Sequence, residues 1–229
     1  MPSAAAALHR RIEATIAFVD LAGFTALTVA HGDEDAARLA TSFAEITRGA
    51  LGPGDRLIKT LGDAVLVTSE TPEGGVALVD RVLTLAAAEN GFPALRAGLH
   101  HGPVIAHGGD VFGAAVNLAS RVANEAYAGE VLGTEPIAAA ARAEGIPVID
   151  LGAVSLKNVS AKVPLFSLAI VVGATDETID PVCRTPVDRH VAAGRLSYRG
   201  VEHWFCSLSC AAAFASNPSW HVGAAKRSR

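Results

Sequence analysis

Two aspartates each follow a short apolar run, and together they are suited to hold divalent cations. Asp20 ends the run at residues 15–19, and Asp63 lies at the tip of a hairpin expected over residues 56–68. Alone, Asp20 could cap a helix and Asp63 could occupy an ordinary turn. If the two strands are neighbours, their carboxylates converge and form a cage for Mg²⁺ or a similar hard cation. Two such ions can support an in-line phosphoryl displacement.

A second group of polar side chains lies between residues 110 and 121. Asn117 and Arg121 are four residues apart in a helix expected from Gly113, so they share one helical face, and Asp110 lies just before that helix. These residues could simply form a solvated face with a capping aspartate. The small and apolar neighbours of Arg121 instead favour a specific acidic ligand for its guanidinium.

Alternating hairpins and helices are expected to position these side chains. Apolar runs predict strands at residues 15–19, 56–60, 64–68, 95–99, 104–106, 131–132, 148–151 and 165–172. Helical spacing predicts helices from Gly23 to a break at 52–54, from Thr71 to a break at 90–91, over 113–128 and after Pro136. Residues 100–103 are expected to be a hairpin turn. This order predicts an α+β fold with a mainly antiparallel sheet, covered on one face by helices.

The composition is that of a folded protein. Of the 229 residues, 50% are hydrophobic and 18% are charged, and the formal net charge is −4. These values exclude a disordered chain and argue against a nucleic-acid-binding protein. No segment reaches the ~20 apolar residues of a membrane helix, and the first residues lack the features of a signal peptide. We therefore expect a cytoplasmic protein that binds neither nucleic acid nor membranes.

Taken together, these motifs resemble class III adenylate/guanylate cyclase catalytic domains over roughly residues 12–170, in order and in spacing. The resemblance is carried by Asp20 in Phe-x-Asp-x-x-Gly-Phe-Thr, by Lys59 and Asp63 in Lys-x-x-Gly-Asp, and by the segment from Asp110 to Arg121. It implies a ferredoxin-like α+β fold and an adenylate cyclase that converts ATP to 3′,5′-cyclic AMP and pyrophosphate. The active sites would lie at the interface of a homodimer.

The resemblance also implies which residues bind the metals and the phosphates. Asp20 and Asp63 would bind two Mg²⁺ or Mn²⁺ ions in each active site. Backbone amides around Gly23, Phe24 and Thr25 would hold the polyphosphate at the start of a helix.

Four further side chains would read the nucleotide and act on it. By the same resemblance, Lys59 and Asp110 would bind the purine, Asn117 would orient the ribose, and Arg121 would stabilise the pentavalent transition state. A lysine only donates hydrogen bonds and an ionised aspartate only accepts them, so this pair complements adenine rather than guanine. ATP is therefore the expected substrate.

One phosphate contact of the family is left open by the spacing. A basic residue near the end of the domain usually contacts the phosphates. Lys157 and Lys162 lie in the corresponding segment, and both are candidates.

The composition changes after residue 172. We expect a cyclase domain over residues 1–172, a polar linker over 173–179, a second domain over 180–222 and a basic tail over 223–229. All three cysteines and both tryptophans follow the linker. The sequence around Cys183, Cys206, Cys210 and Phe214 resembles a YHS domain, which would form a small cysteine-containing module.

The three cysteines allow two interpretations. Cys206 and Cys210 are four residues apart, so on a helix their thiols lie on one side, and with Cys183 they could bind Zn²⁺ or copper. His203 and His190 are candidates for a fourth ligand. Alternatively, the thiols pack as small hydrophobic groups.

The C-terminal segment also leaves two functions open. It could regulate the cyclase as a metal- or thiol-sensing domain. Alternatively, metal or redox sensing is the main function, and the cyclase-like part is only a dimerisation scaffold. A decayed cyclase would have lost some metal or transition-state residues, and all six are present here, which favours the enzyme.

Overall fold

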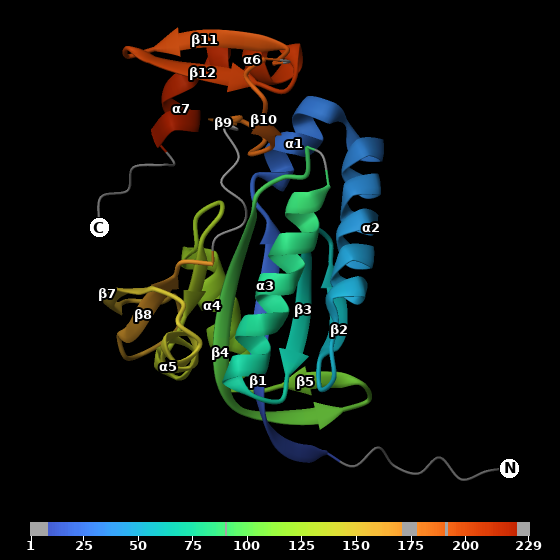
Figure 1. Ribbon diagram of the computed structural model, residues 1–229, viewed down its shortest axis with the longest axis vertical. Coiled ribbons are helices and arrows are strands. Elements are labelled where there is room, and N and C mark those ends of the chain that lie inside the picture. Colours follow the sequence, from blue (N-terminus) through green and yellow to red (C-terminus); the bar gives the residue numbers. More distant parts are fainter. Residues whose placement is uncertain (1–8, 90, 171–177, 191, 224–229) are drawn as a thin grey trace, which may run out of the picture.

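The computed structural model describes residues 9–89, 91–170, 178–190 and 192–223, and one mixed sheet forms its centre (Figure 1). The strand order is β2-β3-β1-β4-β6-β8-β7, and β5 pairs with β4. The β4–β6 pair is parallel and the other pairs are antiparallel, which confirms the predicted α+β class. The strands are β1 (Arg10–Leu21), β2 (Arg56–Leu61), β3 (Ala64–Ser69), β4 (Leu95–His107), β5 (Asp110–Phe112), β6 (Val131–Gly133), β7 (Val148–Val154) and β8 (Val163–Leu168).

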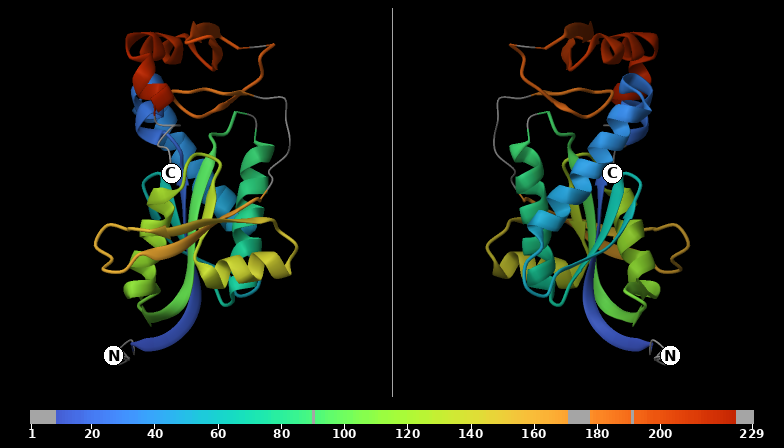
Figure 2. Two further views of the ribbon diagram at one scale, coloured as in Figure 1. Left: turned by 90° about the vertical axis from the view of Figure 1, so that its left-hand side faces the viewer. Right: turned by 90° about the vertical axis from the view of Figure 1, so that its right-hand side faces the viewer.

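Helices cover both faces of this sheet, and not one face as the sequence predicts (Figure 2). Side chains alternate along a strand, so Val19 of β1 packs beneath one set of helices while Ile16 faces α4 on the other side. The first set is α2 (Asp33–Ala50), α3 (Pro72–Ala88) and α5 (Glu135–Ala143), and the opposite face carries α4 (Ala114–Glu125). None of the helices in the described ranges is both long enough and apolar enough to cross a bilayer.

The hairpin turn predicted at residues 100–103 is wrong, because β4 runs without interruption from Leu95 to His107. Pro103 pairs with Glu13 of β1, while β6 pairs only with residues 97–99 of β4 and β5 only with residues 105–107. A proline is tolerated there because one side of β4 has no neighbouring strand to receive an N–H group. The turn lies instead at Gly108 and Gly109, whose φ angles are 59° and 83°.

The first helical region is two helices rather than one. Helix α1 (Phe24–His31) ends at Gly32, which has a φ of 90°, and α2 begins at the next residue. This positive φ suits glycine and changes the chain direction. The predicted start of α3 is confirmed, because the Thr71 side chain accepts a hydrogen bond from the Gly74 N–H at 3.0 Å.

Helix α4 lies directly on the backbone of β4. A Cβ atom placed on Gly98 would lie 2.0 Å from the backbone nitrogen of Ala123. This approach is possible only without a side chain at residue 98. The absent side chain therefore sets how deeply α4 sits on the sheet.

The C-terminal module, which we define as residues 178–223, packs against α1 of the sheet domain, residues 10–168 (Figure 1). Leu27 and Ala36 share one apolar cluster with Val182, Phe205 and Phe214. The expected linker lies outside the described residues except for its last two, which form a strand, and residues 224–229 of the expected tail also lie outside. The module comprises β9 (Thr178–Ile179), β10 (Pro186–Val187), β11 (Gly194–Tyr198), β12 (Val201–Phe205), α6 (Leu208–Ser216) and α7 (Pro218–Gly223).

Candidate active site

Asp20 is held at the end of β1 by an arginine of the neighbouring strand. Asp20 and Arg96 are register partners in the β1–β4 pair, and Arg96 Nε donates to Asp20 Oδ2 at 2.8 Å. A second Arg96 nitrogen, Nη2, contacts the same oxygen. Asp20 lies four residues after Ile16 on the same strand, so both side chains lie on the face of the sheet that carries α4.

The structure brings Asp63 to Asp20. Asp63 follows Gly62, whose φ is 70°, in the turn between β2 and β3, and its carbonyl accepts a hydrogen bond from Leu21 N–H at 3.0 Å. Burial raises the pKa of Asp20, Arg96 opposes that rise, and the Asp63 carboxyl raises it further. Two neighbouring carboxyls with this electrostatic coupling favour a cationic partner.

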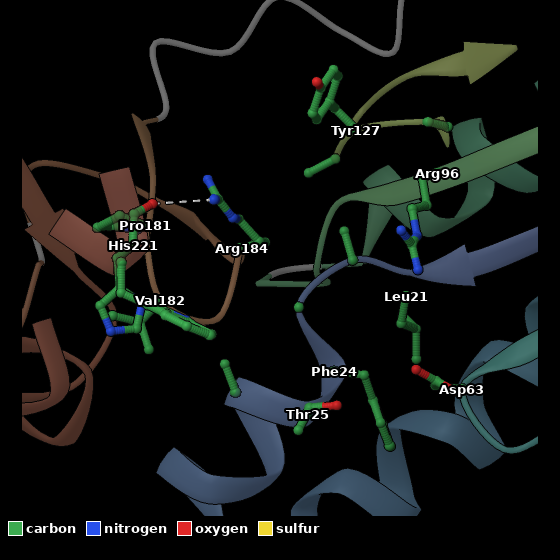
Figure 3. Close-up of a pocket in the computed structure, with 16 residues that line it drawn as sticks. Leu21, Phe24, Thr25, Asp63, Arg96, Tyr127, Pro181, Val182, Arg184 and His221 are labelled. Atoms are coloured by element: carbon green, nitrogen blue, oxygen red, sulfur yellow. Dashed lines mark hydrogen bonds between the residues drawn. The ribbon is translucent and has the colours of Figure 1, made fainter. Parts of the chain in front are cut away.

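The segment after Asp20 lines a cavity of about 600 Å³ (Figure 3). Gly23, with a φ of 78°, turns the chain into α1, so the first-turn residues Phe24 and Thr25 lie along the cavity. The N–H groups at a helix start are a suitable site for phosphate oxygens. Asp63 and Arg96 lie across from this helix start in the same cavity.

One wall of this cavity belongs to the C-terminal module. The sequence does not predict that the module reaches this cavity. Figure 3 shows Pro181, Arg184 and His221 facing the cavity from the side opposite Arg96. The contact with the sheet domain is close, because a Cβ atom on Gly23 would lie 3.0 Å from Arg184 Cγ. The module therefore forms part of the cavity itself.

Lys59 and Asp110 form a second polar group away from this cavity. Lys59 Nζ of β2 donates to Asp110 Oδ2 of β5 at 2.6 Å, and it lies 5.9 Å from the centroid of the Phe112 ring. The hydrogen bond from Lys59 lowers the pKa of Asp110. Both side chains are partly exposed, so a donor and an acceptor are presented side by side.

Asn117 and Arg121 lie one turn apart on α4. Asn117 is exposed and Arg121 is half-buried. Within the described ranges, Arg121 has no carboxylate partner. Neither residue lines the cavity at Asp63, and neither do Lys59 and Asp110.

The two lysines that the sequence leaves as alternatives remain alternatives. Lys157 and Lys162 are both exposed in the connection between β7 and β8. The sequence analysis missed Arg96 and Arg184, which do line the cavity. A charged residue at position 96, within the otherwise apolar run of residues 95–99, was the sequence feature that could have indicated Arg96.

The three cysteines lie together, and the fourth side chain beside them differs from both candidates in the sequence analysis. His31 of α1 faces the thiols, with its Nε2 3.6 Å from Cys206 Sγ. His190 is exposed, and the His203 ring packs 4.8 Å from the Phe214 ring. The sequence could not indicate His31, because it lies 175 residues from Cys206.

Comparison with known proteins identifies the family. The adenylate and guanylate cyclase catalytic domain model matches residues 7–169. A pH-sensitive adenylate cyclase of Mycobacterium tuberculosis is 35% identical over 158 residues, which are 67% of this chain and 40% of that protein. An adenylate cyclase of Streptomyces griseus is 36% identical over 118 residues, 51% of this chain and 30% of that protein. The chain belongs to the adenylate and guanylate cyclase catalytic domain family.

Solved structures agree with this fold. The adenylyl cyclase CyaB of P. aeruginosa superposes with a TM-score of 0.60 at 23% identity, covering 71% of this chain and 96% of that one. An adenylate cyclase of Trypanosoma brucei gives a TM-score of 0.63 at 22% identity, covering 77% and 95%. The chain spans only about 40% of the first curated relatives it matches. The family model ends at residue 169, before the C-terminal module begins.

Proposed function

We propose that this chain is an adenylate cyclase that converts ATP to 3′,5′-cyclic AMP and pyrophosphate at a site shared between two copies. One observation carries the proposal: the six polar residues of the family motifs are all present, and they fall into two groups on one chain. Asp20 and Asp63 belong to the first group. The second group consists of the Lys59–Asp110 pair and the α4 residues Asn117 and Arg121, which share only that they do not line the cavity at Asp63. Two copies arranged face to face would combine one group from each.

The first group fits Mg²⁺ or Mn²⁺. Carboxylate oxygens are the ligands that these hard cations prefer, and burial makes the ionised form of Asp20 dependent on a cationic partner. Arg96 is that partner in the described structure, so Asp20 must share its carboxylate or release Arg96 when a metal binds. When bound, the two ions would lower the pKa of the ribose 3′-hydroxyl and neutralise charge on the triphosphate.

The protein groups around the metals would hold the substrate and stabilise the transition state. The amides of Phe24 and Thr25 at the start of α1 would bind phosphate oxygens. Asn117 of the second copy would orient the ribose so that its 3′-oxygen is in line with the α-phosphorus. Arg121 of that copy, which has no carboxylate partner among the described residues, would meet the charge that grows on the phosphoryl oxygens.

The Lys59–Asp110 pair supports ATP rather than GTP. These two groups lie 2.6 Å apart, so they offer a donor and an acceptor to one edge of a base. Adenine presents an acceptor at N1 and a donor at its 6-amino group, and guanine presents the opposite pattern. With guanine, both protein groups would face like partners.

The C-terminal module is proposed to regulate the rate rather than to catalyse a reaction of its own. Its residues Pro181, Arg184 and His221 line the cavity of the first group, so a shift of the module would change the shape of that cavity. By its sequence around the three cysteines, this module would be a domain of the YHS type. The rival hypothesis, a metal or redox sensor on a dimerisation scaffold, predicts no turnover.

Assay of the purified protein with ATP and Mn²⁺ for cyclic AMP tests the proposal. Asp63→Ala should remove activity and leave the assembly state unchanged, because it deletes a metal ligand and little packing. Asp80→Ala is the matched control, since Asp80 is an exposed aspartate of α3. If the native protein makes no cyclic nucleotide from ATP or GTP, or if Asp63→Ala turns over normally at saturating metal, the proposal is wrong.

A further inference from the structure

Four metal-ligating side chains converge where the C-terminal module meets α1. His31, Cys183, Cys206 and Cys210 each offer one ligand atom, and these atoms all lie within 4.8 Å of one another. Two of the three sulfur–sulfur separations are 3.3 Å for Cys183–Cys206 and 3.7 Å for Cys206–Cys210. His31 Nε2 lies 3.6 Å from Cys206 Sγ and 3.7 Å from Cys210 Sγ.

Three of these four separations are close to the edges of a metal-centred tetrahedron, and the Cys183–Cys206 separation is about half an ångström shorter. Zinc binds thiolate sulfur at ~2.3 Å and imidazole nitrogen at ~2.0–2.1 Å, which places sulfurs about 3.8 Å apart and sulfur about 3.6 Å from nitrogen. All three cysteines are free thiols. Three thiolates and one imidazole, with no place left for a substrate, match a structural Zn²⁺ site rather than a catalytic one.

The cysteine backbones are held in position by a buried aspartate. Asp180 is fully buried, and its carboxylate accepts hydrogen bonds from the N–H groups of Val182 at 2.8 Å and Cys206 at 2.9 Å. Cys210 N–H donates to Ser207 Oγ at 3.1 Å at the start of α6. Such contacts orient the ligands before an ion binds, as the outer hydrogen bonds of metal sites do.

The histidine ligand comes from the sheet domain. His31 is the last residue of α1, and α1 is the helix whose first turn lines the cavity of the candidate active site. Leu27 of α1 lies in one apolar cluster with Val182, Cys183 and Phe214 of the module. An ion bound by these four residues would therefore join two parts of the chain that are far apart in sequence.

We propose that His31, Cys183, Cys206 and Cys210 form a structural zinc site that fixes the C-terminal module on helix α1. The site also determines where Arg184 lies. Arg184 follows Cys183, its carbonyl accepts the Ala94 N–H at 3.1 Å, and its side chain packs on Gly23. Bound zinc thus holds Arg184, and with it this wall of the cavity, in place. The ion itself would not contact the substrate.

The test measures bound metal and needs no ATP. The full chain, expressed with added zinc, is passed through gel filtration, and its zinc is counted by elemental mass spectrometry. We expect one zinc per chain, a loss in His31→Ala and Cys206→Ser, and retention in His190→Ala, whose histidine is exposed. His31→Cys should restore zinc binding, because it supplies a fourth thiolate.

Replacement of zinc by Co²⁺ reads out the ligands directly. The native protein should show the intense visible bands of tetrahedral cobalt and the near-ultraviolet thiolate band, and His31→Ala should change the visible bands. Circular dichroism checks that each variant is folded. If His31→Ala does not fold, the His31→Cys variant still tests the proposal. A native chain without zinc, copper in its place, or an unchanged cobalt spectrum in His31→Ala would overturn the proposal.

Discussion

The sheet domain and the C-terminal module bury their apolar side chains in different ways. The sheet domain has layers on both faces of its sheet, with side chains such as Leu66, Leu99 and Ile137 fully buried. The module has two two-stranded sheets and two short helices, and its cluster is completed by Leu27 and Ala36 of the sheet domain. Small domains need additional stabilisation, such as a bound metal or a neighbouring domain, because they bury too little apolar surface on folding. The module's fold therefore depends on the sheet domain and on its cysteines, while the sheet domain has a core of its own.

The largest expected effects are losses of activity in two variants of the sheet domain that should still fold. Arg121→Ala should lower the turnover number by ~10²-fold or more, because it removes a charge that acts on the transition state. Asp20→Ala should abolish activity. Mixing the two variants should restore activity at one composite site per heterodimer, measured as cyclic AMP formed.

Two controls accompany this experiment. Zinc content should be unchanged in both variants, since neither residue belongs to the module. Absence of recovery on mixing, with exchange of subunits demonstrated by mass spectrometry, would contradict a site shared between two copies.

A pair of phenylalanine truncations compares the two cores. Phe43 is fully buried in the cluster under α2 and α3, and Phe214 is fully buried in the cluster of the module. Each truncation to alanine should cost about 3–5 kcal/mol locally. Phe43→Ala should lower the main thermal transition, whereas Phe214→Ala should expose the module to protease and leave that transition in place. Equal shifts of the main transition would show that the two parts unfold together.

Selectivity between adenine and guanine should respond to the Lys59–Asp110 pair. The native protein should use ATP in preference to GTP, and Lys59→Glu combined with Asp110→Cys should weaken that preference. An unmatched buried polar group costs ~1–3 kcal/mol, so the ratio of kcat/KM values should fall by roughly tenfold or more. Equal use of both nucleotides by the native protein would show that this pair does not read the base.

The smallest effect concerns a half-buried histidine of β4. Burial lowers the pKa of His100 from 6.5, and the charge of His101 lowers it further. Just below pH 6.5, His100 takes up a proton in the unfolded chain but stays neutral in the folded protein. The free energy of unfolding should thus be unaffected above pH 6.5 and should fall as the pH drops below 6.5, with a slope of at most ~1.4 kcal/mol per pH unit.

His100→Asn is the variant that checks this dependence. Asparagine can keep the hydrogen bond to Thr134 Oγ1, which His100 Nδ1 makes at 2.8 Å, but it does not titrate. Denaturant unfolding at several pH values should show a shallower acid dependence in His100→Asn than in the native protein. The exposed His190→Asn should match the native slope, and an unchanged slope in both variants would exclude His100 as the source.

Much of the sheet domain could be predicted from local sequence, and the contacts between distant segments could not. The β2–β3 hairpin and the Thr71 cap depend on neighbouring residues, so their spacing was sufficient. The turn at residues 100–103 was wrong because Pro103 is permitted by an unpaired strand edge that only the sheet order determines. The break at Gly32 was missed because the apolar spacing that indicated a helix begins only at Leu39, beyond the break, so it did not mark where α1 ends.

The same limit applies to the two sites. The motifs around Asp20 and Asp63 could be read locally, and the neighbouring turn and strand end brought them together as expected. Arg184 and His31 lie on opposite sides of the contact between the module and α1, and no local pattern links them.

Gly98 has a consequence for sequence variation among related proteins. Any side chain there would collide with the backbone of α4 at Ala123, and the helix could not relieve the collision by a rotamer change. Substitution would lift α4 and displace Asn117 and Arg121 with it. Purifying selection should therefore retain glycine at this position as strictly as it retains residues that touch the substrate. In a family alignment, an invariant glycine at residue 98 would therefore reflect the packing of α4 on β4 and not a chemical role.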